Sequence, residues 1–348
     1  MDEIARVVTE ASVRTIAIVG CSKNSGKTTA MNHVLEGLQG VFERIGIMSI
    51  GIDGEEADFW LGVPKPRVAV REGYLVATAE KAIRSGTAQV RTLARTGAVS
   101  PLGELLLVRV EKPGLLLLAG VRHKADVRSL VEAMFRHQAQ RVVIDGSYQR
   151  LMTADPEVSN GVILATGAVL GRTVKEVAKR TKVTLDRLLL PAVSEPEDRL
   201  LLDDALRHRR PAVREKSGRI TVLAESGAST DEGGLKDALG KGDVTVAVPG
   251  VVNDRIFRVL VSHRPGRVRL LLADPTRLFA SAPILNKFKE RGGEVLAGRT
   301  VRLLAVAVNP VSVLGYELPE EALIAAVRAI TPENIPVFSF HDRCGVEG

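Results

Sequence analysis

The sequence predicts an α/β fold in which a mostly parallel sheet is covered by helices on both faces. Short β-branched and aliphatic runs alternate with amphipathic helical stretches from the start of the chain. The first of these runs leads into a glycine-rich loop and then into a helix. With 348 residues, the chain is also too long for one typical hydrophobic core, so we expect two domains.

The strand–loop–helix unit near the start of the chain is the clearest element. Residues 14–19 form the predicted strand, and residues 28–38 form the predicted helix, in which apolar side chains recur at helical spacing up to Gly40. Strands and helices then continue to alternate. Further strands are predicted at residues 44–50, 141–144 and 161–165, and further helices at residues 77–85, 126–138 and 173–182.

An antiparallel β-hairpin is predicted as an insertion in this sheet. Its strands are residues 104–110 and 115–119, which flank the sequence Glu-Lys-Pro-Gly at residues 111–114. Proline and glycine are typical of the tight turns that join antiparallel strands. We therefore expect the hairpin to turn at residues 111–114.

A change of composition suggests where the first domain ends. Proline, arginine and acidic residues are concentrated between about Pro191 and Gly218, and a second alternating set of strands and helices follows. We therefore predict a first domain over residues 1–192, a linker over residues 193–217, and a second, smaller α/β domain over residues 218–348. The second domain is expected to bind a partner.

The glycine-rich loop has the sequence GCSKNSGKT from Gly20 to Thr28, which predicts a P-loop NTPase domain. Backbone N–H groups of such a loop can surround a β-phosphate, helped by the positive end of the following helix. Gly26 would allow close approach of the phosphate, Lys27 would bridge the β- and γ-phosphates, and the Thr28 hydroxyl would bind Mg²⁺. The residues predicted to bind the nucleotide are Asn24, Ser25, Gly26, Lys27, Thr28 and Thr29.

The spacing of this loop departs from the usual pattern. Five residues separate Gly20 from Gly26, where the common motif has four, and Cys21 occupies the place of the first glycine. This spacing resembles the loop of dethiobiotin synthetase and of the cobyrinate amidase group within the P-loop NTPases. The alternative is a glycine-rich turn that binds nothing.

Phosphoryl transfer also needs an acidic side chain at the end of a neighbouring strand, where it can hold Mg²⁺ directly or through water. Asp145 follows a buried Val-Val-Ile run and is the natural candidate; its alternative role is a helix cap or turn residue. Asp53 follows the strand after the loop helix and would lie near the γ-phosphate, or in an acidic solvent loop. The predicted catalytic residues are Lys27, Asp53 and Asp145, and the predicted metal ligands are Thr28, Asp145 and Asp53.

Two other positions near the loop have open interpretations. The thiol of Cys21 could have a lowered pKa among N–H donors and be redox-sensitive, or it could be a small buried filler. Thr166 and Gly167 follow the strand at residues 161–165, where sheets of this kind often contact a nucleotide base.

Composition narrows the function classes. The net charge of +7 comes from basic residues interspersed with acidic ones, and aromatic residues are only 3% of the chain, so nucleic-acid binding is not favoured. No stretch approaches the roughly 20 apolar residues that cross a bilayer. The N-terminus lacks a signal-peptide pattern, and two distant cysteines form no disulfide framework. We expect a cytoplasmic protein.

Several segments together with the loop resemble a known family, the reactivase subunit associated with lysine 5,6-aminomutase. The resemblance extends over roughly residues 14–190 and less securely to the end. The segments that carry it are residues 20–29, 49–55, 65–67, 75–79, 100–104 and 162–168.

This resemblance implies an ATP-dependent protein that acts on an adenosylcobalamin- and pyridoxal-phosphate-dependent aminomutase. A reactivase would use nucleotide binding and hydrolysis to release damaged cobalamin from the mutase. The implied partners are the aminomutase or a second reactivase subunit, and the implied cofactors are ATP, or GTP, and Mg²⁺. Two alternatives stay open: an ATP-dependent ligase of the dethiobiotin synthetase type, and a nucleotide-dependent nucleic-acid protein.

Overall fold

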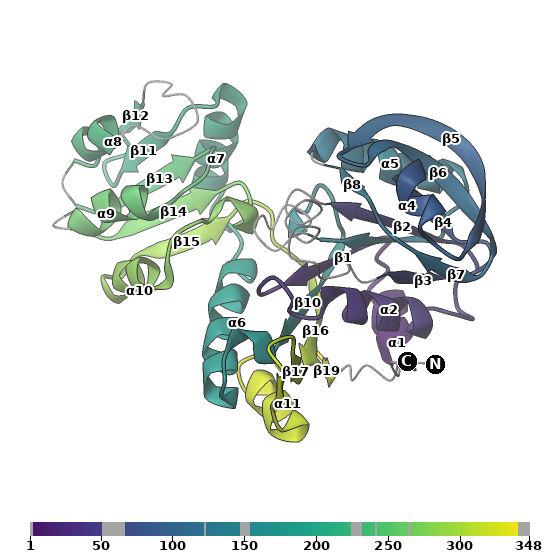
Figure 1. Cartoon of the computed structure of the whole chain (residues 1–348). Helices are drawn as coiled ribbons and strands as arrows, with labels where there is room; N and C mark the ends of the chain where they lie inside the picture. The colour runs from purple at the N-terminus through teal and green to yellow at the C-terminus, as the bar shows by residue number, and fades with distance from the viewer. Residues whose placement is uncertain are drawn as a thin grey trace. The chain divides into compact units, whose positions relative to one another are not determined.

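The computed structural model confirms an α/β architecture with a mostly parallel central sheet (Figure 1). The chain divides into two compact units. Unit 1 consists of Met1–Thr184 and Arg302–Gly348, and unit 2 consists of Leu185–Val301. The structure describes residues 3–50, 67–121, 123–146, 154–223, 232–240, 242–263 and 266–339.

Unit 1 is built on one large sheet. Its strands are β1 Thr15–Gly20, β2 Ile45–Ile50, β4 Leu75–Ala79, β5 Gln89–Ser100, β6 Gly103–Lys112, β8 Gly120–Val121, β9 Arg141–Asp145, β10 Gly161–Gly167, β16 Leu303–Asn309 and β19 Val337–Ser339. They lie in the order β19-β16-β10-β1-β9-β2-β4-β6-β5, and β8 pairs with β2. All neighbours from β19 to β4 are parallel, whereas β6 and β5 are antiparallel. The loop strand β1 therefore lies inside the parallel part.

Helices and two short pairs of antiparallel strands complete unit 1. The helices are α1 Glu3–Glu10, α2 Lys27–Gly37, α4 Glu80–Arg84, α5 Lys124–Arg136, η2 Ala168–Leu170, α6 Val174–Leu188 and α11 Glu320–Arg328. The short antiparallel pairs are β3 Val68–Val70 with β7 Gly114–Leu116, and β17 Val311–Ser312 with β18 Tyr316–Glu317. The last four residues of α6 belong to unit 2.

Alternate residues of the central strands face two separate cores. Ile18 of β1 and Val143 of β9 pack in the cluster that includes α1 and α2. Ile144 of β9 and Met48 of β2 point the other way and pack against α5. Every residue of β1 is buried, as expected for a strand covered on both faces. Burial of each large aliphatic side chain contributes about 1.5–3 kcal/mol.

The inserted hairpin exists, but its predicted position is wrong. The hairpin joins β5 to β6 through Pro101 and Leu102. Residues 111 and 112 end β6 and residue 114 begins β7, so the hairpin does not turn at residues 111–114. Pro113 has no N–H to continue the ladder, and Gly114 begins β7, which pairs with β3. A Cβ on Gly114 would lie 2.5 Å from the backbone nitrogen of Ala88, so close backbone packing explains this glycine.

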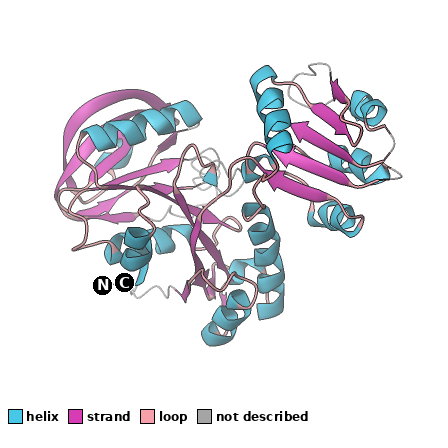
Figure 2. Cartoon of the chain, turned by 180° about the vertical axis from the view of Figure 1, so that it is seen from behind, coloured by secondary structure: helices cyan, strands magenta, loops and turns pink. Residues whose placement is uncertain are grey.

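Unit 2 has a sheet of its own, in the order β12-β11-β13-β14-β15, with helices on both faces (Figure 2). Strands β13, β14 and β15 are parallel, and β11 and β12 are antiparallel. On one face, Phe257 and Phe288 meet edge to face with ring centroids 5.1 Å apart. The elements are α7 Pro196–His208, β11 Ala212–Glu215, β12 Ile220–Val222, α8 Glu232–Ala238, β13 Val244–Val248, α9 Asp254–Ser262, β14 Val268–Leu272, η3 Pro275–Arg277, α10 Ala282–Glu290 and β15 Glu294–Ala297.

The units do not follow the predicted division into residues 1–192, 193–217 and 218–348. The expected linker is α7 and β11, which are regular elements of unit 2. The expected end of the second domain returns to unit 1, because β16 pairs with β10 and then with β19. Unit 2 is thus inserted in unit 1. Local apolar periodicity identifies β16 as a strand but does not specify which sheet it joins.

None of the helices within the described ranges is long and apolar enough to span a membrane.

The insertion predicts how fragments of the chain behave. A fragment of residues 185–301 should fold alone, whereas a fragment of residues 1–192 should not, because it lacks β16. Leu304, Ala305 and Ala307 of that strand are buried in the main core of unit 1, and their loss exposes the neighbouring face of β10. Circular dichroism melting of both fragments checks this. A cooperative melt of the 1–192 fragment would contradict the division described here.

Candidate functional site

The glycine-rich loop, residues 20–28, leaves the sheet from β1, between β10 and β9. Ile18 near the end of β1 lies beside Asp145 in the parallel register with β9. The amide of Cys21 donates a hydrogen bond to the carbonyl of Ala165 at 2.8 Å, which ties the start of the loop to β10. The loop therefore begins at the carboxyl edge of the parallel sheet, where ligands bind in sheets of this class.

The loop is folded tightly on itself. Asn24 and Gly26 both have left-handed backbone conformations, with φ of 62° and 85°. A Cβ on Gly20 would overlap the hydroxyl of Ser25 and lie 3.0 Å from side-chain atoms of Lys27. Gly20 is thus required by close approach, and Gly26 by its backbone conformation.

Two backbone N–H groups and one hydroxyl near the start of α2 make no hydrogen bond among the described residues. Gly26 is the N-cap of α2, and no side chain caps its first turn. Within the described part of the chain, the backbone N–H groups of Asn24 and Gly26 make no hydrogen bond, and the buried hydroxyl of Ser25 has none either. Lys27 Nζ donates to the carbonyl of Ser22 at 3.4 Å, so the ammonium extends back over the loop. An uncapped helix N-terminus and a nearby ammonium both favour an anion.

Asp145 is the acidic residue that the fold places beside the loop. It ends β9, and Ser49 of the adjacent strand β2 donates to its Oδ2 at 3.4 Å. The amide of Gly146 donates to the carbonyl of Ile18 at 2.9 Å, which keeps the end of β9 against β1. The other predicted acid, Asp53, lies outside the described residues. Of the two predicted acids, the structure thus positions Asp145.

Asn309 is a residue of the site that sequence reasoning missed. It ends β16, and a Cβ on Gly26 would lie 2.9 Å from its Nδ2. A Cβ on Gly167 would overlap its backbone oxygen. The Oδ1 of Asn309 accepts the amide of Val311 at 3.0 Å, which fixes the side chain at the start of the following turn. An Asn-Pro pair directly after an aliphatic run was the available sequence indication, since such pairs mark turns at strand ends.

Thr166 does not present its side chain at the sheet edge as a base contact would require. It is fully buried, and its hydroxyl lies 2.6 Å from that of Thr181 on α6. The thiol of Cys21 lies against the same hydroxyl groups and makes hydrogen bonds with Thr166, Thr184 and Thr181. Burial raises the pKa of Cys21 to about 11, and these hydrogen bonds and Lys27 only partly oppose the shift. Burial thus raises the pKa of the Cys21 thiol instead of lowering it, which favours the interpretation of Cys21 as a small buried filler.

The donor set beside the loop fits Mg²⁺ by its chemistry. Thr28 in the first turn of α2 and Asp145 at the end of β9 both offer oxygen, the donor that Mg²⁺ prefers. In the parts of the chain that are described, no group of three or more His, Cys, Asp and Glu side chains forms an all-protein metal site.

In a comparison with known proteins, no protein-family model matches the chain, and no curated protein matches it.

The raised pKa predicts that Cys21 resists alkylation. At pH 8, a thiol with a pKa of about 11 is only about 0.1% thiolate, and the thiolate is the reactive form. In a Cys344→Ser variant, iodoacetamide should leave the folded protein unlabelled at pH 8 while the denatured protein reacts fully. Labelling should rise as the pH approaches 11. Intact-mass spectrometry measures both, and rapid labelling of the folded protein at pH 8 would contradict the burial of this thiol.

Proposed function

We propose that unit 1 is a Mg²⁺-dependent P-loop nucleoside triphosphatase. The observation that carries the proposal is the uncapped N-terminus of α2, which faces a loop with unused N–H groups at Asn24 and Gly26 and with Lys27 extended over it. A phosphate chain in the loop would accept these N–H groups and the positive end of the helix. The hydroxyl of Ser25, buried without a partner in the described chain, supports the same ligand chemistry.

Each residue has a separate role in this proposal. Lys27 would leave the carbonyl of Ser22 and place its ammonium between the β- and γ-phosphate oxygens, where charge develops during transfer. Thr28 and Asp145 would hold Mg²⁺, which neutralises charge on these oxygens when bound. Ser49 donates to Asp145 and so orients the carboxylate. Asp53 remains a predicted second acid at the γ-phosphate.

The nucleotide is proposed to be ATP, with GTP as the other candidate. The base would lie beside the carboxyl ends of β10 and β16, next to the loop. There, Gly167 and Asn309 pack against each other and Asn309 also contacts Gly26. An amide side chain at this edge offers both a donor and an acceptor to a purine.

The process that hydrolysis drives is proposed from the family resemblance. We propose ATP-driven reactivation of an adenosylcobalamin-dependent lysine 5,6-aminomutase, in which damaged cobalamin is released. The position of the loop supports a motion of α6 that is coupled to the nucleotide site, because α6 contacts Cys21 and also continues into unit 2. Unit 2 is then the proposed partner-binding part.

The loop assignment predicts that Lys27→Ala abolishes nucleotide hydrolysis without unfolding the protein. Lys27 is half-buried, and its ammonium has a loop carbonyl as partner, so the loss to stability should be within about 1 kcal/mol. Turnover with Mg²⁺-ATP and Mg²⁺-GTP should fall by about a hundredfold or more, because the lost charge acts mainly in the transition state.

Phosphate release measures this effect, and thermal melting checks the fold. Lys81→Ala is the matched control, since it removes the same charge from the exposed surface of α4. Turnover equal to wild type in Lys27→Ala would remove the P-loop assignment.

The reactivase proposal predicts that an inactivated aminomutase stimulates the ATPase. Slow basal hydrolysis should accelerate when the aminomutase carries damaged cobalamin, and free cobalamin should appear in step with phosphate. Lys27→Ala should release none. Coupled measurement of phosphate and of cobalamin absorbance after filtration tests this. Stimulation by a small carboxylate or amine instead of the mutase would point to a ligase.

A further inference from the structure

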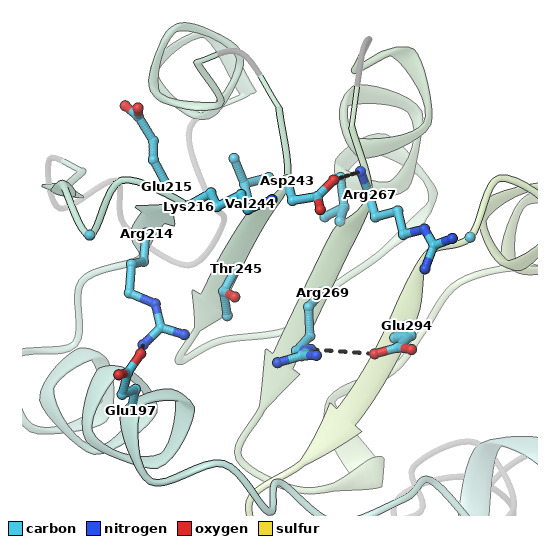
Figure 3. A pocket seen from close by; sticks show the side chains of 13 residues that line it. Glu197, Arg214, Glu215, Lys216, Asp243, Val244, Thr245, Arg267, Arg269 and Glu294 are labelled. Carbon is cyan, nitrogen blue, oxygen red and sulfur yellow. Dashed lines mark hydrogen bonds and ion pairs between the residues drawn. The ribbon is translucent and has the colours of Figure 1, made fainter.

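Unit 2 has a polar hollow on one face of its sheet (Figure 3). Helix α7 covers part of this face, where Leu202 and Ala205 pack on Ala247 and Leu271. Towards the amino ends of the parallel strands, the residues on this face are polar: Thr245 lies two residues before Ala247, and Arg269 lies two residues before Leu271. A cavity of about 330 Å³ lies over this part. One row across its floor consists of residues paired in register on neighbouring strands, namely Arg214, Thr245, Arg269 and Glu294.

A buried carboxylate orders the floor of the hollow. Asp198 of α7 is 0% exposed, and its Oδ1 accepts a hydrogen bond from Arg214 while its Oδ2 accepts one from Arg269 at 2.7 Å. A buried carboxylate is costly to leave unpaired, so both guanidinium groups are held in place on either side of Thr245. The pKa of Arg269 is raised chiefly by its hydrogen bond to Asp198, as expected for a guanidinium beside a buried carboxylate.

The outer partners of the two arginines are weakly held. Arg214 contacts Glu197 at 3.0 Å, and Arg269 contacts Glu294 at 3.3 Å. The side chains of Glu197 and Glu294 are 81% and 60% exposed, so water screens both pairs. A ligand anion can therefore replace these carboxylates at little cost, whereas Asp198 stays in place below.

Two further cations at the hollow have no carboxylate partner among the residues that the structure describes. Lys216 follows β11 and Arg267 precedes β14, and within the described ranges neither makes an ion pair. Asp243 precedes β13, the strand that lies between β11 and β14. Its carboxylate accepts a hydrogen bond from the backbone amide of Arg267 at 2.8 Å. The hollow thus combines two immobilised guanidinium groups with two cations that are available to an anion.

The acidic side chains at the rim restrict which anion fits. Four carboxylates line the hollow beside its four cations, so a polyanion such as nucleic acid would be repelled along its length. A single dianionic group at the floor meets mainly cations, because Asp198 is covered. The carboxylate of Asp243 can then accept hydrogen bonds from hydroxyl groups of the same ligand. The volume limits the ligand to a small molecule.

We propose that this hollow is a binding site for a small phosphate monoester that carries hydroxyl groups. Its phosphate would lie over Thr245 between Arg214 and Arg269, with Lys216 and Arg267 completing the charge. The site is independent of the glycine-rich loop, since every residue that forms it belongs to unit 2.

The test uses the full chain with Lys27→Ala, which removes the ammonium from the loop of unit 1, and the substitutions in unit 2 then separate binding at the hollow from binding at the loop. Isothermal titration with ribose 5-phosphate should show one site per chain, and inorganic phosphate should compete for it. Adding Lys216→Gln and Arg267→Gln should weaken binding by at least about tenfold, because two charge-assisted contacts are lost. Neither substitution breaks an ion pair within the described chain, so the fold should persist.

Two further variants make the outcome decisive. Lys287→Gln with Lys289→Gln removes the same charge from exposed positions of α10 and should leave the dissociation constant unchanged. Glu294→Gln should tighten binding several-fold, since it removes the carboxylate that competes for Arg269. No heat from ribose 5-phosphate, or equal loss in the α10 control, would overturn the proposal. Weaker binding in Glu294→Gln would overturn the placement of the phosphate.

Discussion

The packing of Asn309 against Gly26 and Gly167 is the constraint on which the candidate site depends. A Cβ at either glycine would collide with Asn309, so this arrangement holds the left-handed turn of the loop against the ends of two strands. Asn309 can reach this position only because β16 lies beside β10. The geometry of a loop near the N-terminus is therefore determined in part by residues synthesised almost 300 positions later.

The same loop contacts both segments that connect the two units. Cys21 bonds to Thr181 and Thr184 of α6, the helix through which the chain enters unit 2. Gly26 contacts Asn309 at the end of β16, the strand through which the chain has returned. The first connection is helix α6, whereas residues 298–302, between β15 and β16, belong to no helix or strand. The loop thus contacts the helix that enters unit 2 and the strand that follows the return to unit 1.

The sequence predicted local structure well because local structure depends on local spacing. The β1–loop–α2 unit follows from an aliphatic run, a glycine-rich segment and helical periodicity, and Asp145 follows from a strand end. The partner of each strand was not predictable in this way: β16 has the pattern of a buried strand in either sheet. Strand β5 was missed because it is an edge strand with many exposed polar residues, which lacks the apolar run of a buried strand. The position of Asn309 beside the loop follows only from the pairing of β16 with β10.

The insertion of unit 2 also sets the order in which the two cores can close during synthesis. All five strands of unit 2 are synthesised before β16 and β19. Until then, β10 is an open edge of the host sheet, and the apolar surface that β16 covers is exposed. Domains generally fold as units while the chain emerges, so the inner domain becomes compact first and the outer one last. The nascent host sheet is consequently the part of this protein most dependent on protection from aggregation.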